Sequence, residues 1–147
     1  MKGLPIEMNS QGKVLLYILL FILTAFLISI VIMYTREDPD AVRKRNSNIR
    51  VEVLNGCGEN RLAIKVANIL RRSGFNVLKI GNAAQQDFLY TVVIERRDDD
   101  LSNAKYFARR IGCKNIGKDI DPALHLEVSV ILGQDYREFF NDVEKEF

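Results

Sequence analysis

Residues 51–70, with the sequence VEVLNGCGENRLAIKVANIL, have the residue types of a phosphate-binding loop: a strand-like segment, a glycine-rich bend and a helix-like segment. A dinucleotide-binding fingerprint has the form G-x-G-x-x-G, and its third glycine lets helix and strand pack closely. Gly56 and Gly58 fit this pattern, but Arg61 occupies the third position. Glu59 would also repel an anion at the start of the helix. The pattern therefore favours a structural turn over a nucleotide site.

This turn supplies the site residues that the sequence singles out. Asparagine and glycine adopt backbone angles that other residues avoid, so Asn55, Gly56 and Gly58 are expected to adopt such angles. Cys57 lies between the two glycines. We predict a structural turn that could also contact a partner, formed by Asn55, Gly56, Cys57 and Gly58.

Residues that could do catalytic or metal chemistry are few and far apart. His125 is the only histidine, so a nucleophile would have a single candidate base, and we interpret it as a surface or edge residue. Cys57, Cys113 and His125 do not have the spacing of zinc ligands. The acidic run 98–100 could suggest calcium, but acids at a helix start are expected from capping alone. We predict no catalytic residue, no metal site and no cofactor.

The elements that would position these residues follow from hydrophobic periodicity. Alternating apolar residues predict strands, and apolar residues on one helical stripe that end at Gly74 and Gly112 predict helices. The predicted strands are 49–54, 76–81, 90–95 and 126–132, and the predicted helices are 61–73 and 99–111. This order predicts an α+β fold, a two-layer βαββαβ sandwich of the split-βαβ, ferredoxin-like kind. Residues 114–124 could hold a short extra strand, and the chain is expected to end in a frayed helix.

A hydrophobic segment precedes this domain. Residues 14–34 carry no charge and, at about 1.5 Å per residue, are long enough for a bilayer core of roughly 30 Å. We predict a single uncleaved transmembrane helix there, after a short tail over 1–13. Residues 35–48 are charged, contain Pro39 and are expected to form a flexible linker. The basic run 43–45 could contact anionic headgroups, although a solvated run is the simpler interpretation.

Charge leaves the orientation of the span open and argues against nucleic acid. Lys2 and Lys13 precede the span, whereas Arg36, the run 43–45 and Arg50 follow it, which by the positive-inside rule places the domain in the cytoplasm. A domain of about a hundred residues can nevertheless translocate regardless of such charges. The whole chain has a net charge of +2, but basic and acidic residues are equal in number from position 46 onward. A nucleic-acid binder would show a basic surplus.

Several short motifs, taken together and in order, resemble the LytR C-terminal domain family. They are V-x-V-L-N-G-x-G, a helix that opens with L-A, G-F-x-V, G-N-A and V-x-V-x-L-G-x-D-Y, at residues 51–58, 62–63, 74–77, 81–83 and 128–136. The resemblance implies a domain over 49–136, followed by a tail over 137–147. The LytR-CpsA-Psr catalytic domain, which often precedes this domain, has no counterpart here.

The resemblance implies a cell-envelope protein without catalytic residues to transfer. It implies a single-pass protein of the cytoplasmic (inner) membrane with an extracytoplasmic C-terminal domain that binds wall polymer or an envelope protein. The alternative is a cytoplasm-facing adaptor for a soluble protein, and the oligomeric state stays open. In the predicted fold, Cys57 and Cys113 lie at the same edge, which permits a disulfide, but the family does not depend on a cysteine pair and free thiols are favoured.

Overall fold

The computed structural model describes residues 9–145 of the chain, which forms two compact units, Met1–Asp38 and Pro39–Phe147. The predicted tail 1–13 lies partly outside the described residues. Helix α1 (Ser10–Thr35) contains the predicted span, and none of its residues is buried. By length and composition it is a candidate membrane-spanning helix.

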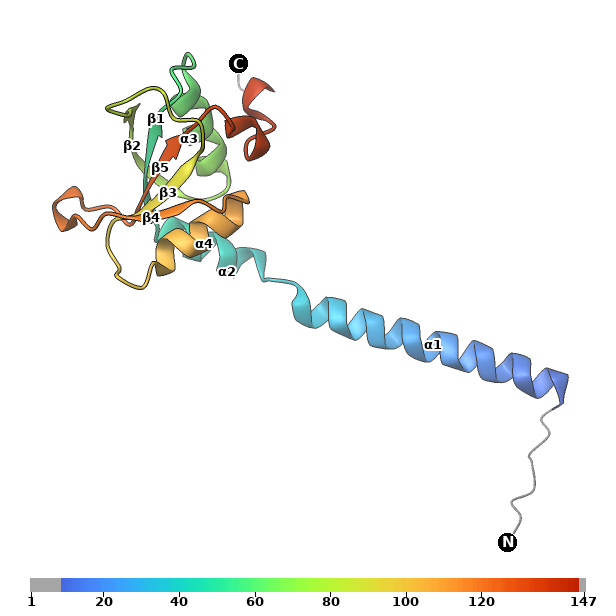
Figure 1. The fold of residues 1–147 in the computed structure, drawn as a ribbon. Coiled ribbons are helices and arrows are strands. Elements are labelled where there is room, and N and C mark those ends of the chain that lie inside the picture. Colours follow the sequence, from blue (N-terminus) through green and yellow to red (C-terminus); the bar gives the residue numbers. More distant parts are fainter. Residues whose placement is uncertain (1–8, 146–147) are drawn as a thin grey trace, which may run out of the picture. The chain divides into compact units, whose positions relative to one another are not determined.

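Residues that were expected to form a flexible linker form helix α2 (Pro39–Ser47), which belongs to the second compact unit (Figure 1). Pro39 suits the first position of a helix because its missing N–H would have no partner there. Asn46 is 1% exposed; its amide donates to the Ser73 carbonyl at 2.7 Å and accepts from the Tyr106 hydroxyl at 2.8 Å. Contacts far away in the sequence therefore order a segment that has no hydrophobic period of its own.

The second unit contains five strands and two longer helices in the order β1–α3–β2–β3–α4–β4–β5. Their bounds are β1 (Arg50–Asn55), α3 (Leu62–Arg72), β2 (Asn76–Asn82), β3 (Val92–Glu95), α4 (Ser102–Ile111), β4 (Ile116–Lys118) and β5 (Val128–Leu132). The strands form one sheet in the order β2-β1-β5-β3-β4. The α+β class is confirmed, and β4 is the short extra strand that residues 114–124 could hold.

The split-βαβ arrangement is not the one found. In a split unit another strand lies between the two strands that a helix connects, but here β2 pairs directly with β1, and β4 with β3, both in parallel. Strand β5 lies between the β1–α3–β2 and β3–α4–β4 units, parallel to β1 and antiparallel to β3. Hydrophobic periodicity indicates that strands exist, but it does not indicate which strands pair, so the sequence order alone led to the wrong topology.

The core lies between the sheet and the helices α3 and α4. Val51 and Val53 of β1 and Val128 and Val130 of β5 are fully buried. The rings of Phe75 and Phe107 join the two helical halves of the core, with centroids 4.9 Å apart. Both helices end at a glycine with positive φ, 91° at Gly74 and 82° at Gly112, as predicted.

The chain ends in short 3₁₀ helices, η2 (Tyr136–Glu138) and η3 (Val143–Lys145), in place of the expected frayed helix. Tyr136, Phe140 and Val143 are buried in the same core cluster. A further 3₁₀ helix, η1 (Pro122–Leu124), precedes β5. The C-terminal segment is thus part of the packed domain up to the last described residues.

Polar side chains cover part of the sheet face opposite the helices. The Arg50 side chain donates to both carboxylate oxygens of Glu127, and the Ser129 hydroxyl donates to Glu52 at 2.8 Å. Arg96 donates to the Ser129 hydroxyl at 2.9 Å and forms an ion pair with Asp119. Ser129 has no exposed surface because this network covers it.

Candidate binding pocket

The glycine bend starts with Asn55, the last residue of β1, which holds the turn together. Its side-chain amide donates to the Glu59 carbonyl at 2.7 Å, and its oxygen accepts from the Cys57 backbone N–H at 3.3 Å. Asn55 is 6% exposed. An asparagine that bonds to the backbone two residues later forms an Asx turn, and here the turn directs the chain from β1 to α3.

The two glycines of the bend have different roles, which corrects the expectation of unusual backbone angles throughout. Only Gly58 has a positive φ, 75°, whereas neither Asn55 nor Gly56 does. A Cβ atom at Gly56 would lie 2.7 Å from Ile131 Cγ2 and 2.9 Å from the Leu132 carbonyl oxygen. A glycine is therefore required at position 56 because β5 approaches the backbone too closely to leave room for a side chain.

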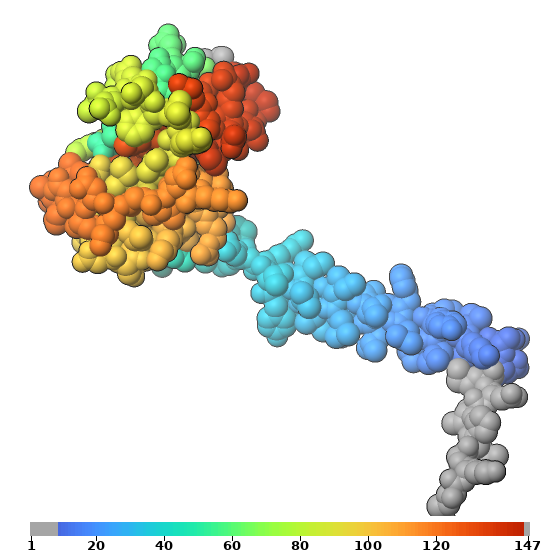
Figure 2. Space-filling view, viewed as in Figure 1, coloured from blue at the N-terminus to red at the C-terminus, as the bar shows by residue number. Residues whose placement is uncertain are grey.

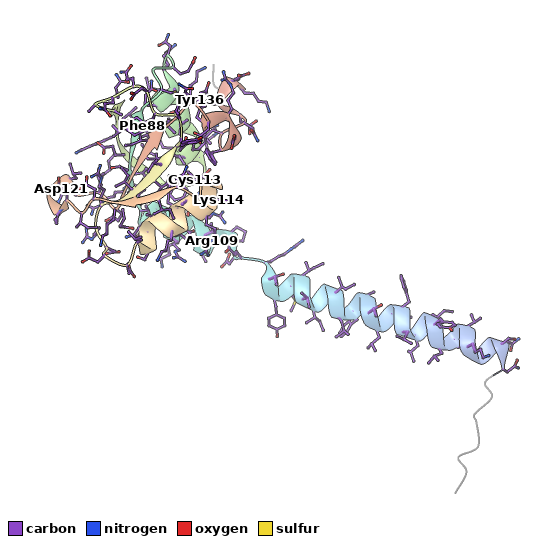
Figure 3. The ribbon with its side chains drawn as sticks, viewed as in Figure 1. Phe88, Arg109, Cys113, Lys114, Asp121 and Tyr136 are labelled. Atoms are coloured by element: carbon purple, nitrogen blue, oxygen red, sulfur yellow. The ribbon has the colours of Figure 1, made fainter. Side chains whose placement is uncertain are left out.

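The loop before β3 crosses this end of the sheet (Figure 3). The Phe88 N–H donates to the Gly56 carbonyl at 2.8 Å, and the Gln134 N–H donates to the Phe88 carbonyl at 3.0 Å. Asp135 accepts from the backbone N–H and the hydroxyl of Thr91, both at 2.7 Å. The L-G-x-D-Y motif therefore fastens this loop to the end of β5, which is a structural role.

A pocket of about 450 Å³ lies beside the bend, at the carboxyl ends of β1 and β2 and the N-terminal end of α3. Its polar lining is rich in side-chain amides, and its apolar lining includes Ile64 and Ile80. The lining amides are Asn55, Asn60, Asn82 and Gln86, with the charged residues Glu59 and Arg61 beside them. Carboxyl ends of parallel strands are a common position for ligand sites in α/β sheets. Amide side chains both donate and accept hydrogen bonds, so this lining suits a ligand rich in hydroxyl or amide groups.

The structure places the four predicted site residues together, and two of them, Asn55 and Gly58, line the pocket. Gly56 is packed under Phe88, and Cys57 is half-buried against the core. Asn60, Asn82 and Gln86 also line the pocket but are not among the site residues predicted from the sequence. Direct parallel pairing of β1 with β2 would have indicated them, because it brings the end of β2 beside the end of β1.

A buried carboxylate at the end of β3, which was not predicted from the sequence, bonds to the start of α4. Glu95, the last residue of β3, has no exposed surface. Its carboxylate accepts from the backbone N–H of Ala104 at 2.7 Å, and from those of Arg97 and Asp98 at 3.3 and 3.2 Å. Because a carboxylate at a helix N-terminus satisfies free N–H groups and suits the helix dipole, Glu95 fills this end of α4.

The two cysteines, His125 and the acidic run 98–100 lie outside the pocket lining. Cys57 and Cys113 are free thiols, and burial raises the pKa of the Cys113 thiol, which donates to the Thr91 carbonyl. His125 is exposed, with a φ of 54°. In the acidic run, Asp100 accepts from the Ser102 backbone N–H at 3.0 Å, and Asp98 accepts from the side chains of Asn103 at 2.6 Å and Ser102 at 3.2 Å. Within residues 9–145, no group of three or more His, Cys, Asp or Glu side chains is placed to hold a metal ion.

The family described as LytR cell envelope-related transcriptional attenuator, LytR_C, matches residues 48–136. The chain belongs to this family. No curated protein and no solved structure matches the chain. The match spans the sheet, helices α3 and α4 and the pocket, and the LytR_C domain is a non-catalytic C-terminal domain.

Proposed function

We propose that this LytR_C protein is a membrane-anchored, non-catalytic module of the cell envelope whose domain binds wall polymer or an envelope protein partner. The observation that carries the proposal is the combination, in one chain, of an envelope-related domain over residues 48–136 and a candidate membrane-spanning helix, α1. In this proposal α1 anchors the chain in the cytoplasmic membrane as a single pass, and the domain lies on the extracytoplasmic side.

The pocket beside the glycine bend supports wall polymer as the ligand. Its lining offers the side-chain amides of Asn60, Asn82 and Gln86 within a space of about 450 Å³, together with a short apolar wall, whereas the Asn55 amide is bonded within its own turn. Sugar rings present hydroxyl groups at their edges and C–H groups on their faces, and these match amides and aliphatic side chains respectively. The pocket opens at a sheet end whose backbone is fixed by Asn55 and by the loop at Phe88.

The second candidate function is a cytoplasm-facing membrane adaptor for a soluble protein. The observation that favours it is the basic run 43–45, which follows α1 within a short distance in the sequence. The positive-inside rule counts such residues as cytoplasmic. The two functions therefore differ first in the side of the membrane on which the domain lies.

A pair of fusions after Phe147 separates these functions. Alkaline phosphatase folds only outside the cytoplasm, so we expect an active enzyme in cells that express the fusion. Green fluorescent protein at the same position should be dark, because it does not fold after export through the general secretory pathway. Fluorescent cells with inactive phosphatase would overturn the envelope function and support the adaptor.

The pocket is tested with full-length chain in detergent and isolated cell walls. We expect the chain to sediment with the walls, and the double variant Asn82→Ala/Gln86→Ala to bind at least about fivefold less, because both removed amides line the pocket. The matched control is Asn76→Ala/Gln85→Ala, which removes two exposed amides outside the lining. If the chain sediments with walls equally well in both variants, the pocket is not the polymer site; if no chain sediments, the ligand is not wall polymer.

A further inference from the structure

Seven exposed cations lie on α2, on α4 and on the turn that follows α4. Besides Arg110 they are Arg43, Lys44, Arg45, Lys105, Arg109 and Lys114, and we name these six the α2–α4 basic surface. The second compact unit, Pro39–Phe147, carries 18 basic and 16 acidic residues, so its charges are nearly balanced and this surface is a local concentration of positive charge. Figure 2 shows the surface of α2 directly against that of α4.

Contacts between α2 and α4 hold the two groups of cations beside each other. The Arg45 guanidinium lies over the Tyr106 ring, 3.8 Å from its centroid, and the Tyr106 hydroxyl donates to buried Asn46. Arg109 follows Tyr106 by three positions on α4, so the two side chains are neighbours on one side of the helix. These contacts place the end of α2 that carries Arg45 beside α4, so the exposed basic run belongs to an ordered helix.

A shallow apolar groove of about 410 Å³ opens within this surface. Lys105, Arg109 and Lys114 line it, and no acidic residue is among its lining residues. Its apolar part includes exposed Ile116 and buried Cys113, and Figure 3 shows Arg109, Cys113 and Lys114 together around the end of α4. Arg109 and Lys114 form no ion pair with a residue of the described part of the chain.

The length of chain before α2 indicates which anion is near this surface. Three residues, Arg36, Glu37 and Asp38, connect the end of α1 at Thr35 to the start of α2 at Pro39. Fully extended, they span at most roughly 14 Å between the Cα atoms of Thr35 and Pro39. If α1 crosses the membrane, α2 is thereby held within reach of the headgroup layer, which is several ångströms thick on each side of the hydrocarbon core.

We propose that the α2–α4 basic surface binds the anionic phospholipid headgroups of the membrane in which the chain is anchored. The proposal rests on the membrane anchoring in the proposed function, but not on the side of the membrane or on the pocket ligand. Lys and Arg close to an anionic bilayer are attracted to it electrostatically, and the apolar groove can accept the upper part of a lipid. A wall polymer could also neutralise these cations, but the short connection to α1 places lipid phosphates nearest.

The test uses full-length chain in lipid nanodiscs, one set of phosphatidylcholine and one of equal parts phosphatidylcholine and phosphatidylglycerol, with amide hydrogen exchange as the readout. In the anionic discs we expect exchange to slow several-fold in residues 39–47 and 109–118. The slowing should disappear at high salt, because screening weakens the attraction. The variant Arg109→Glu/Lys114→Glu should lose it, whereas Lys65→Glu/Lys79→Glu, which makes the same charge change on α3 and β2, should keep it.

The outcomes separate this proposal from the proposed function. Equal exchange in the two kinds of disc overturns lipid binding, and so does slowing that appears only when soluble polyglycerol phosphate is added, which would assign the surface to an anionic polymer. Unchanged exchange of the variants in the neutral discs shows that they are folded. A chain that does not insert into either disc overturns the membrane anchoring itself.

Discussion

The two parallel β-α-β units of this LytR_C domain begin their helices in different ways. In both units a non-glycine residue with positive φ precedes the helix, Arg61 before α3 and Leu101 before α4. Both helices end at a glycine with positive φ. The backbones are therefore alike, and the difference lies in the side chain at the end of the preceding strand.

That side chain is Asn55 in the first unit and Glu95 in the second. Glu95 reaches the first turn of α4, where its carboxylate accepts from the Ala104 N–H. The shorter Asn55 side chain bonds only within its own turn, to Cys57 and the Glu59 carbonyl. One helix start is thus filled by the chain's own anion, whereas the other borders the pocket. The two units thus differ in whether the side chain at the strand end reaches the first turn of the helix that follows.

The largest effect is expected for Glu95→Ala. It leaves the buried N–H of Ala104 in the first turn of α4, and the part-buried N–H groups of Arg97 and Asp98 in the preceding loop, without this acceptor, and we expect the free energy of unfolding to fall by about 3 kcal/mol. Urea unfolding of the detergent-solubilised chain, followed by circular dichroism, measures this loss. Glu95→Gln keeps one acceptor and should lose less stability. Equal losses for the two variants would show that the packing of the Glu95 side chain, and not its hydrogen bonds, stabilises the start of α4.

Gly56→Ala tests the packing of the other helix start. The new Cβ atom would overlap Ile131 and the Leu132 carbonyl, and we expect a loss of about 2 kcal/mol because the neighbouring strand must shift. Gly58→Ala has ordinary space near Gln86 but a positive φ, and should lose about 1 kcal/mol. The melting temperatures of the two variants show which loses more stability. A larger loss for Gly58→Ala would mean that the positive φ at Gly58 matters more to the bend than the close packing at Gly56.

Asn55→Ala tests how far the open end depends on its own turn. It removes two hydrogen bonds at the edge of the pocket, and we expect a loss of about 1 kcal/mol in the free energy of unfolding. Wall binding should fall more strongly than stability, because Glu59 and Asn60 of the lining lose their support. A loss in the free energy of unfolding as large as that of Glu95→Ala would show that Asn55 and Glu95 stabilise the domain equally.

The smallest effect is a dependence on pH at Glu127, which contacts Arg97 in the loop between β3 and α4. Burial alone would raise the pKa of Glu127, but hydrogen bonds from Arg50 and the charges of Arg50 and Arg97 outweigh it and lower the pKa. The resulting stabilisation is present above the unfolded pKa of about 4.3 and is lost as the pH falls through the lower folded value. Unfolding of wild type and Glu127→Gln between neutral and acid pH should show a larger loss of stability in the wild type, and equal losses would contradict a contribution from Glu127.

Features that depend on neighbouring residues could be predicted from the sequence. The apolar run of α1, the alternation in β1 and β5, and the glycine ends of α3 and α4 all follow from preferences within a few positions. The motif set determined the family in the same way, because its pieces lie in order along the chain.

The tertiary structure alone decided the features that depend on partners far away in the sequence. Strand pairing places β2 beside β1 and so creates the pocket, and the contacts of Asn46 with Ser73 and Tyr106 order α2. Gly56 is required by Ile131 and Leu132, and Glu95 has its role because it ends a strand whose helix packs directly over it. Periodicity and turn chemistry specify local backbone, whereas hydrogen-bond partners and packing neighbours are specified only once the chain is folded, since their sequence separation carries no local signal.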